Sequence, residues 1–302
     1  MLSEPISTAA GIKQIILLQR VLSSNGILSC LPKHVTRFYN KKNYFCKPSS
    51  LRLGGFFYFI MQKIWTENIL VNWENISEKG HLSLHSLSLF LVRAAINHAE
   101  NLDFGFSTTS QERQSWVLFR LNIKINSLPK LNENIKVVTW PGKITGITAS
   151  RGFEMYDSKS NEKLCVASSD WLVINMDTRK PQRLEKYFKS EFLNPDKIAL
   201  DKIPVKFNFR GNFEELFKIR TFYTDLDMNG HVIAHNYFKW LQDAASINNP
   251  NKTPSFIQMN YINECKRDET ISIRFSKDDN MSYMGFNENT NKVAFTAGIV
   301  FD

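Results

Sequence analysis

The chain has 302 residues, enough for one large domain or two of ordinary size. Hydrophobic residues make up 43%, aromatic residues 13% and charged residues 22%, a composition that excludes an intrinsically disordered protein. The net charge is +9, but residues 1–60 hold eight Lys or Arg and one acidic residue, so the rest of the chain has little excess charge and no nucleic acid partner is expected.

Residues 1–60 differ from the rest of the chain. They are basic, contain several serines and show no clear strand or helix periodicity. Two interpretations stay open: a transit peptide or other targeting segment, which has this kind of composition, or an extension upstream of a translation start at Met61. The first predicts the interior of a plastid or another organelle, and the second, for a bacterial protein, predicts the cytoplasm. In both cases we expect residues 1–60 to lie outside the catalytic fold.

Residues 61–183 show a strand, a helix and then several strands. Residues 65–71 are patterned as a strand, and residues 82–100 carry apolar side chains at the helical steps of three and four. Alternation predicts a strand at 116–125 with one face formed by Val117, Phe119, Leu121, Ile123 and Ile125. Further strands are predicted at 135–140, 148–156 and 163–176, with a hairpin turn at 157–161.

Residues 180–205 are polar and contain three prolines, which predicts a linker with one short helix. The first pattern then repeats, with a strand at 217–223, a helix at 232–246 and strands at 255–264, 270–276, 282–287 and 293–301. A strand, a helix and antiparallel strands that wrap the helix follow one another in a hotdog domain. The sequence therefore predicts an α+β fold of two hotdogs in tandem: an N-terminal one at 61–183, a linker at 184–205 and a C-terminal one at 206–302.

Several classes of site have no support in the sequence. Cys30, Cys46, Cys165 and Cys265 form no CxxC pair and no cluster with histidine, so neither a zinc site nor a disulfide framework is expected. No apolar run approaches the roughly 20 residues of a membrane span, so no integral membrane segment is expected. The serine-hydrolase elbow, the phosphate loop and the dinucleotide fingerprint are all missing from the sequence.

A polar cluster precedes the second helix. Asp227, Asn229 and His231 alternate along a short segment that we expect to be extended, so that their side chains point to one side. Aspartate and asparagine can hydrogen-bond, and histidine can relay a proton near neutral pH. Gly230 permits close backbone approach. The free N–H groups and the dipole of the following helix would favour developing negative charge, such as a thioester oxyanion.

Glu264 lies at the end of the strand predicted to begin near residue 255. A strand that wraps the second helix can bring Glu264 close to His231, and a carboxylate beside an imidazole is the usual arrangement for activating water. Cys265, the next residue in the strand, would point to the opposite face. We therefore interpret Cys265 as a packing residue.

These residues carry a resemblance to a known family. Residues 225–232, with Tyr237 and Trp240, resemble the C-terminal hotdog motif of the acyl-acyl carrier protein thioesterases of plant plastids and their bacterial relatives. Residues 261–268 resemble the following strand of that family, including its Glu-Cys pair. Residues 116–118, 138–140, 168–171 and 177–179 match the first half in the same order. The resemblance covers residues 62–302 and leaves out the N-terminal stretch.

The resemblance implies hydrolysis of the thioester of an acyl-acyl carrier protein, which releases a free fatty acid and ends its elongation. By position, the resemblance implies that Asp227, Asn229, His231 and Glu264 are catalytic. It matches Cys265 to a cysteine of the family whose role as a nucleophile is doubtful. It implies no metal and no organic cofactor. We expect Glu264 and His231 to activate a water, and an acyl-enzyme on Asp227 or Cys265 is the alternative.

The first hotdog would hold the acyl chain, and a basic surface would meet the acidic carrier protein. Candidates for that docking face are Lys124, Lys130, Lys136, Lys180, Arg183, Lys186 and Lys189. Two other functions stay open: a broad acyl-coenzyme A thioesterase of the hotdog fold and a non-catalytic acyl-binding protein. A homodimer is one arrangement compatible with the sequence.

Overall fold

The computed structural model describes residues 50–53, 56–59, 62–184, 190–200 and 203–302. Most of the basic N-terminal stretch, together with Lys186 and Lys189, lies outside these residues. Strands β1 (Ser50–Leu53) and β2 (Phe56–Phe59) form an antiparallel pair within the segment that showed no periodicity. Strand β2 is aromatic at all four positions, so its sequence shows no alternation of polar and apolar residues.

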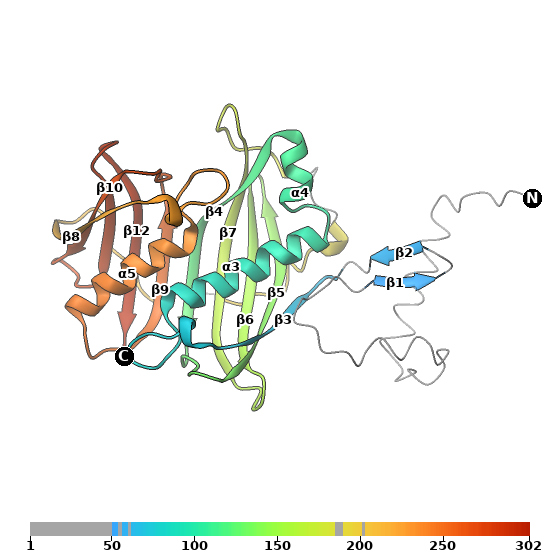
Figure 1. The fold of residues 1–302 in the computed structure, drawn as a ribbon, viewed down its shortest axis with the longest axis horizontal. Coiled ribbons are helices and arrows are strands. Elements are labelled where there is room, and N and C mark those ends of the chain that lie inside the picture. The colour runs from blue at the N-terminus through green and yellow to red at the C-terminus, as the bar shows by residue number, and fades with distance from the viewer. Residues whose placement is uncertain (1–49, 54–55, 60–61, 185–189, 201–202) are drawn as a thin grey trace, which may run out of the picture. The chain divides into compact units, whose positions relative to one another are not determined.

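The larger sheet is antiparallel and has ten strands in the order β3-β5-β6-β7-β4-β9-β12-β11-β10-β8 (Figure 1). Its first half consists of β3 (Trp65–Leu70), β4 (Gln114–Ile125), β5 (Asn134–Thr145), β6 (Thr148–Asp157) and β7 (Lys163–Asn175). Its second half consists of β8 (Phe213–Arg220), β9 (Pro254–Tyr261), β10 (Thr270–Ser276), β11 (Ser282–Asn287) and β12 (Lys292–Phe301). Both halves have the same internal strand order, and pairing of β4 with β9 joins them into one sheet.

Two helices, α3 (Leu84–Asn101) and α5 (Ala234–Asn248), lie across the same face of this sheet (Figure 1). Ser83 caps α3 by accepting the backbone N–H of Ser86 at 3.1 Å. The shorter helices are α4 (Phe106–Thr109) and the 3-10 turns η1 (Trp73–Asn75), η2 (Ser110–Glu112), η3 (Ser190–Phe192) and η4 (Tyr223–Asp225). Among the described residues no helix has both the length and the apolar character needed to cross a membrane.

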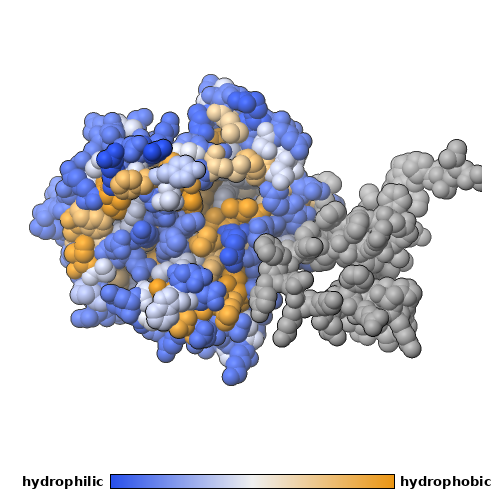
Figure 2. All heavy atoms as spheres, viewed as in Figure 1, coloured by the Kyte–Doolittle hydropathy of each residue, from blue (hydrophilic) through white to orange (hydrophobic). Residues whose placement is uncertain are grey.

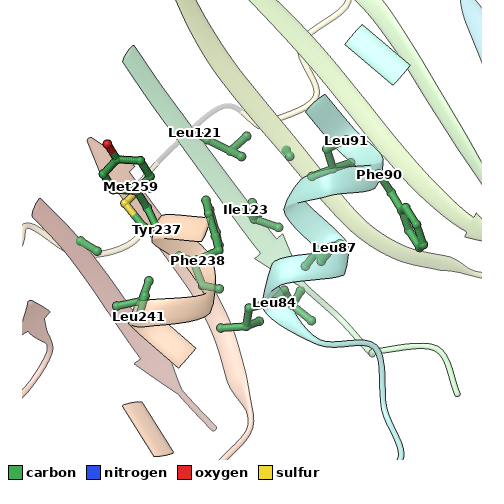
Figure 3. Close-up of a cluster of buried hydrophobic side chains, with 14 of the residues drawn as sticks. Leu84, Leu87, Phe90, Leu91, Leu121, Ile123, Tyr237, Phe238, Leu241 and Met259 are labelled. Carbon is green, nitrogen blue, oxygen red and sulfur yellow. The ribbon is translucent and has the colours of Figure 1, made fainter. Parts of the chain in front are cut away.

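The two helices bury their apolar stripes in a core that both halves share (Figure 3). Leu87 and Leu91 of α3 and Phe238 and Leu241 of α5 are all fully buried, over Ile123 of β4. Burial of a side chain of this size contributes about 1.5–3 kcal/mol. The imidazole rings of His85 and His235 meet edge to face, with 4.7 Å between their centroids, so the helices also touch through matching positions. Each helix with its five strands is one hotdog, and the predicted tandem fold is confirmed.

Two strand predictions need correction. In β4 the register shifts between Leu118 and Arg120, so Leu118 is buried whereas Phe119 is only half-buried, and the single predicted face ends at this bulge. Strand β8 covers residues 213–220 instead of 217–223, because Tyr223 belongs to the 3-10 turn η4. The predicted limits of the two domains and of the linker stay a prediction.

Candidate active site

The polar cluster before α5 forms a tight turn. Leu226 bridges to Val232 in an antiparallel pair, and the N–H of Asp227 donates to the carbonyl of His231 at 2.8 Å. Gly230 has a φ of +76°, which a residue with a side chain rarely adopts. The predicted extended conformation is therefore wrong, because the chain reverses direction between Asp227 and His231.

The turn nevertheless brings the three predicted polar residues together. One carboxylate oxygen of Asp227, Oδ1, accepts the backbone N–H groups of Asn229 at 2.8 Å and His231 at 3.1 Å. The other, Oδ2, accepts the side-chain amide of Asn229 at 3.3 Å. Asp227 therefore fixes the turn and orients Asn229, while the turn itself stays exposed to solvent.

Glu264 reaches this turn from a loop. Strand β9 ends at Tyr261, and the N–H groups of Ile262 and Asn263 then share the carbonyl of Ala294, so the expectation that Glu264 ends a strand was wrong. The carbonyl of the next residue, Cys265, accepts the N–H of Val232 at 2.8 Å and holds the loop against the turn. Glu264 Oε2 lies 3.2 Å from His231 Nε2. The predicted proximity of carboxylate and imidazole is thus present without the predicted strand.

An arginine from the first hotdog completes the pair. Arg179 lies in the turn after β7 and donates from Nη2 to Glu264 Oε1, which leaves Glu264 Oε2 facing His231. This turn is built by Asn175, whose side-chain oxygen accepts the N–H groups of Asp177 at 3.1 Å and Thr178 at 2.8 Å. Sequence reasoning noted Arg179 only as part of a matching segment. No pattern in one sequence indicates a contact between residues this far apart.

Cys265 is buried and lies away from solvent, whereas Glu264 beside it is exposed. Burial raises the pKa of the Cys265 thiol to about 11. The thiol is therefore protonated near neutral pH, and a protonated thiol is a poor nucleophile. This supports the interpretation of Cys265 as a packing residue.

An apolar cavity of about 450 Å³ begins at this turn. Its lining joins Asp227, Met228 and Asn229 to apolar side chains of the first hotdog, among them Ala95, Ile96, Phe104, Trp116 and Trp171. Figure 2 shows apolar residues exposed across the middle of this face, where α3 crosses the sheet. Clefts lined mostly by apolar groups with a few polar groups at one end are typical binding sites for small apolar ligands.

A buried cation lies in the wall of this cavity. Arg151 donates from Nη1 to His98 Nδ1 at 3.0 Å and to Thr139 Oγ1 at 3.3 Å. Because arginine cannot accept, His98 Nδ1 is the acceptor and His98 Nε2 carries the proton that goes to the Gln62 carbonyl at 2.6 Å. Burial, with the nearby charge of Arg151, lowers the pKa of His98 to about 3, and burial lowers that of Arg151 to about 9. At neutral pH the histidine is neutral and the arginine is charged.

The first hotdog holds a matching turn with no carboxylate at the positions of Asp227 and Glu264, although Glu78 stands at the position of Met228. Its bridge of Ile76 to Leu82, its backbone bond from Ser77 to His81 and the positive φ of Gly80 all repeat the turn before α5. The bond from Leu82 N–H to the Pro129 carbonyl at 2.7 Å repeats the bond from Val232 to Cys265. When the two turns are aligned by these matching hydrogen bonds, Ser77, Lys79 and Leu128 stand at the positions of Asp227, Asn229 and Glu264. The first turn therefore has no counterpart of the His231–Glu264 pair at matching positions.

The paired turns could have been found in the sequence, because Gly80-His81 and Gly230-His231 stand at equal distances before their helices. Within the ranges that the structure describes, no three His, Cys, Asp or Glu side chains are grouped to bind a metal ion. The site is thus a solvent-accessible His–Glu pair held by Arg179. It follows a turn whose Asp227 and Asn229 line part of the apolar cavity.

Solved structures share this fold. An acyl-ACP thioesterase from Bacteroides thetaiotaomicron superposes with a TM-score of 0.68 at 24% identity, over 80% of this chain and 98% of that one. The 12:0-ACP thioesterase from Umbellularia californica superposes with a TM-score of 0.67 at 18% identity, over 81% of this chain and 99% of that one. By fold, the chain is a tandem hotdog protein of the kind that these thioesterases represent.

The family is defined by sequence. The model of the acyl-ACP thioesterase N-terminal domain matches residues 62–192, and that of the C-terminal domain matches residues 209–298. The chain belongs to the acyl-ACP thioesterase family. Oleoyl-acyl carrier protein thioesterase 2 of Arabidopsis thaliana, a chloroplastic protein, is 25% identical over 227 residues, and the palmitoyl-acyl carrier protein thioesterase of that plant is 21% identical over 221 residues. These matches take in 68% and 69% of this chain but only 61% and 54% of the relatives.

Proposed function

We propose that the chain hydrolyses the thioester of an acyl-acyl carrier protein and releases a free fatty acid. The observation that carries the proposal is the turn at Asp227–Asn229, which lines part of the apolar cavity and also holds His231, the partner of Glu264. An acyl chain in the cavity would place its thioester carbonyl at this pair. Membership of the family and the names of its relatives support the same activity.

In the proposed mechanism, Glu264 and His231 activate a water that lies between them and the carbonyl. The water oxygen forms the new bond to the carbonyl carbon, its proton passes to the pair, and the carbon–sulfur bond then breaks as the carrier thiol takes up that proton. Asn229 positions the carbonyl or the water, and Asp227 orients Asn229. Arg179 holds Glu264 so that its free oxygen faces His231. No cofactor takes part in this scheme.

The two hotdogs would divide the work. Residues 61–183 supply most of the cavity wall and would bind the acyl chain, and residues 206–302 supply Asp227, Asn229, His231 and Glu264. The apolar side chains in the lining, such as Ala95, Trp116 and Trp171, favour a hydrocarbon chain over a polar substrate. By releasing the fatty acid, this reaction would end elongation of the acyl chain in fatty-acid synthesis.

The test uses the purified full chain with carrier protein and coenzyme A bearing the same acyl groups. We expect free fatty acid from both, with kcat/KM higher for the carrier substrates and falling as salt is raised, because exposed charges are screened. Equal kcat/KM for the two donors and no effect of salt would favour a broad acyl-coenzyme A thioesterase. Saturable acyl binding without any release would favour a non-catalytic acyl-binding protein.

Location and assembly need separate tests. The plant relatives are chloroplastic, which supports a targeting role for residues 1–60 of this chain, in competition with a translation start at Met61. Fusion of residues 1–60 to a fluorescent protein would direct it into an organelle only in the first case.

A homodimer is a further proposal, and sedimentation of the purified chain over a range of concentrations decides between a monomer and a dimer.

A further inference from the structure

Two loops beside the cavity mouth expose aromatic and basic side chains. The first loop carries Phe222 and Tyr223, whose exposed fractions are 57% and 75%, and the second follows Glu264 and carries Lys266 and Arg267. Arg220, at the end of β8, is 61% exposed in its side chain. We define Arg220, Phe222, Tyr223, Lys266 and Arg267 as the basic–aromatic patch.

Contacts within the patch hold these side chains in place. Arg220 and Arg267 approach the same carboxylate, that of Asp268, at 3.1 Å and 3.4 Å. The Arg220 guanidinium lies 5.8 Å from the centre of the Phe222 ring, and that of Arg267 lies 6.0 Å from the centre of the Tyr223 ring. Two of the three cations of the patch share the carboxylate of Asp268, so this carboxylate offsets only part of the charge of the three.

Backbone contacts tie the two loops to each other. Thr221 Oγ1 donates to the carbonyl of Lys266 at 2.5 Å, and the N–H of Asp268 donates to the carbonyl of Thr221 at 3.0 Å. Thr221 itself is fully buried. A surface that is ordered before binding loses less conformational entropy when a partner docks.

The same loops carry the catalytic groups. Arg267 follows Glu264 by three residues, and Tyr223 precedes Asp227 by four. Of the docking residues expected from the sequence, Lys180 follows Arg179, which contacts Glu264, whereas Lys124 lies near the far end of β4. Strand β4 runs from Trp116 in the cavity wall to Lys124, a span of eight residues or roughly 26 Å. A partner on Lys124 would hold its thioester far from His231.

We propose that the basic–aromatic patch is the docking surface for an acidic carrier protein that delivers the acyl thioester. Its cations would steer an acidic partner, and its exposed aromatic rings would anchor the contact. Docking at this patch places the thioester at the mouth between Asp227 and Glu264. The inference rests on the proposed function and adds the surface that selects the carrier over coenzyme A.

The test compares the full chain with two double charge reversals, Arg220→Glu with Arg267→Glu and, as the matched control, Lys124→Glu with Lys130→Glu. Both change the net charge equally. For the patch variant with an oleoyl carrier protein, we expect KM to rise about tenfold or more while kcat changes less than twofold. With oleoyl-coenzyme A, both constants should stay within twofold of the parent. The control should match the parent on both substrates.

A second variant guards against misfolding of the first. Tyr223→Ser removes an exposed ring, and we expect it to raise KM for the carrier substrate alone, with an unchanged melting temperature. Equal losses on both substrates, or no loss in either variant while the parent is active, would overturn the patch. Dissociation of a dimer by the charge reversals would assign the patch to self-association and also overturn it. If the parent hydrolysed neither substrate, the proposed function itself would fail.

Discussion

Arg179 donates a hydrogen bond to Glu264 across the junction of the two hotdogs. The arginine belongs to the turn after β7 in the first half, and the glutamate belongs to the loop after β9 in the second. Since the other oxygen of Glu264 faces His231, the first half of the chain orients the carboxylate that we propose to be catalytic in the second half.

Removal of this contact should slow the chemical step. A charge-assisted hydrogen bond is worth about 1.5–3 kcal/mol, so we expect Arg179→Met to lower kcat by about 10-fold to 100-fold with little change in KM. Arg179→Lys should keep a larger share of the turnover, and added guanidinium should restore part of the activity of the methionine variant. A rise in KM without loss of kcat would mean that Arg179 contacts substrate instead.

The turn before α5 should be far more sensitive than its counterpart in the first half. We expect Asp227→Ala and Asn229→Ala each to lower turnover by about 100-fold or more, because Asn229 would position the carbonyl or the water and Asp227 orients Asn229. Ser77→Ala alters the position that corresponds to Asp227 in the other hotdog and should keep parental turnover. Equal losses at Ser77 and Asp227 would show that the turns matter for folding and not for chemistry.

Cys265 should be dispensable for turnover. Because burial raises the pKa of its thiol to about 11, Cys265→Ala should retain most of the activity, with a modest loss of stability from the smaller buried side chain. Activity is measured beside a thermal melt. An acyl group trapped on Cys265 and detected by mass spectrometry would establish the acyl-enzyme route in place of direct attack by water.

His98 should make stability fall in mild acid. Its pKa of about 3 in the folded chain lies below the ordinary value of 6.5, so between these values the unfolded chain binds a proton that the folded chain does not. The free energy of unfolding should therefore drop by about 2–3 kcal/mol from this residue alone between pH 7 and pH 4.5. Urea unfolding should show a smaller drop for His98→Gln, and equal drops would contradict the assignment.

Much of the fold was readable in the sequence. Strands β10 and β11 match the predicted limits, and α3 and α5 lie within two residues of theirs. The two helices have one buried and one solvated side, so their periodicity is clear. Strand β8 was misplaced because residues 213–216 include two exposed glutamates that hide its start.

The site was less readable than the fold. The motif placed Asp227, Asn229 and His231 together, but the Asn-Gly pair within it is a turn signal that argued against an extended segment. Neither the loop that carries Glu264 nor the contact with Arg179 follows from periodicity, because both depend on how distant segments meet. The cavity also depends on side chains from both halves. The catalytic roles of Asp227, Asn229, His231 and Glu264 stay predictions.

The most direct measurement of the central claim is release of fatty acid from an oleoyl carrier protein by the parent chain, Glu264→Ala and His231→Ala. The account predicts release by the parent and a loss of about 100-fold or more in kcat for each variant, with circular dichroism unchanged. The double variant should lose little more than either single one, because the two groups act as a unit. Near-parental kcat in a folded Glu264→Ala variant would contradict activation of water by this pair.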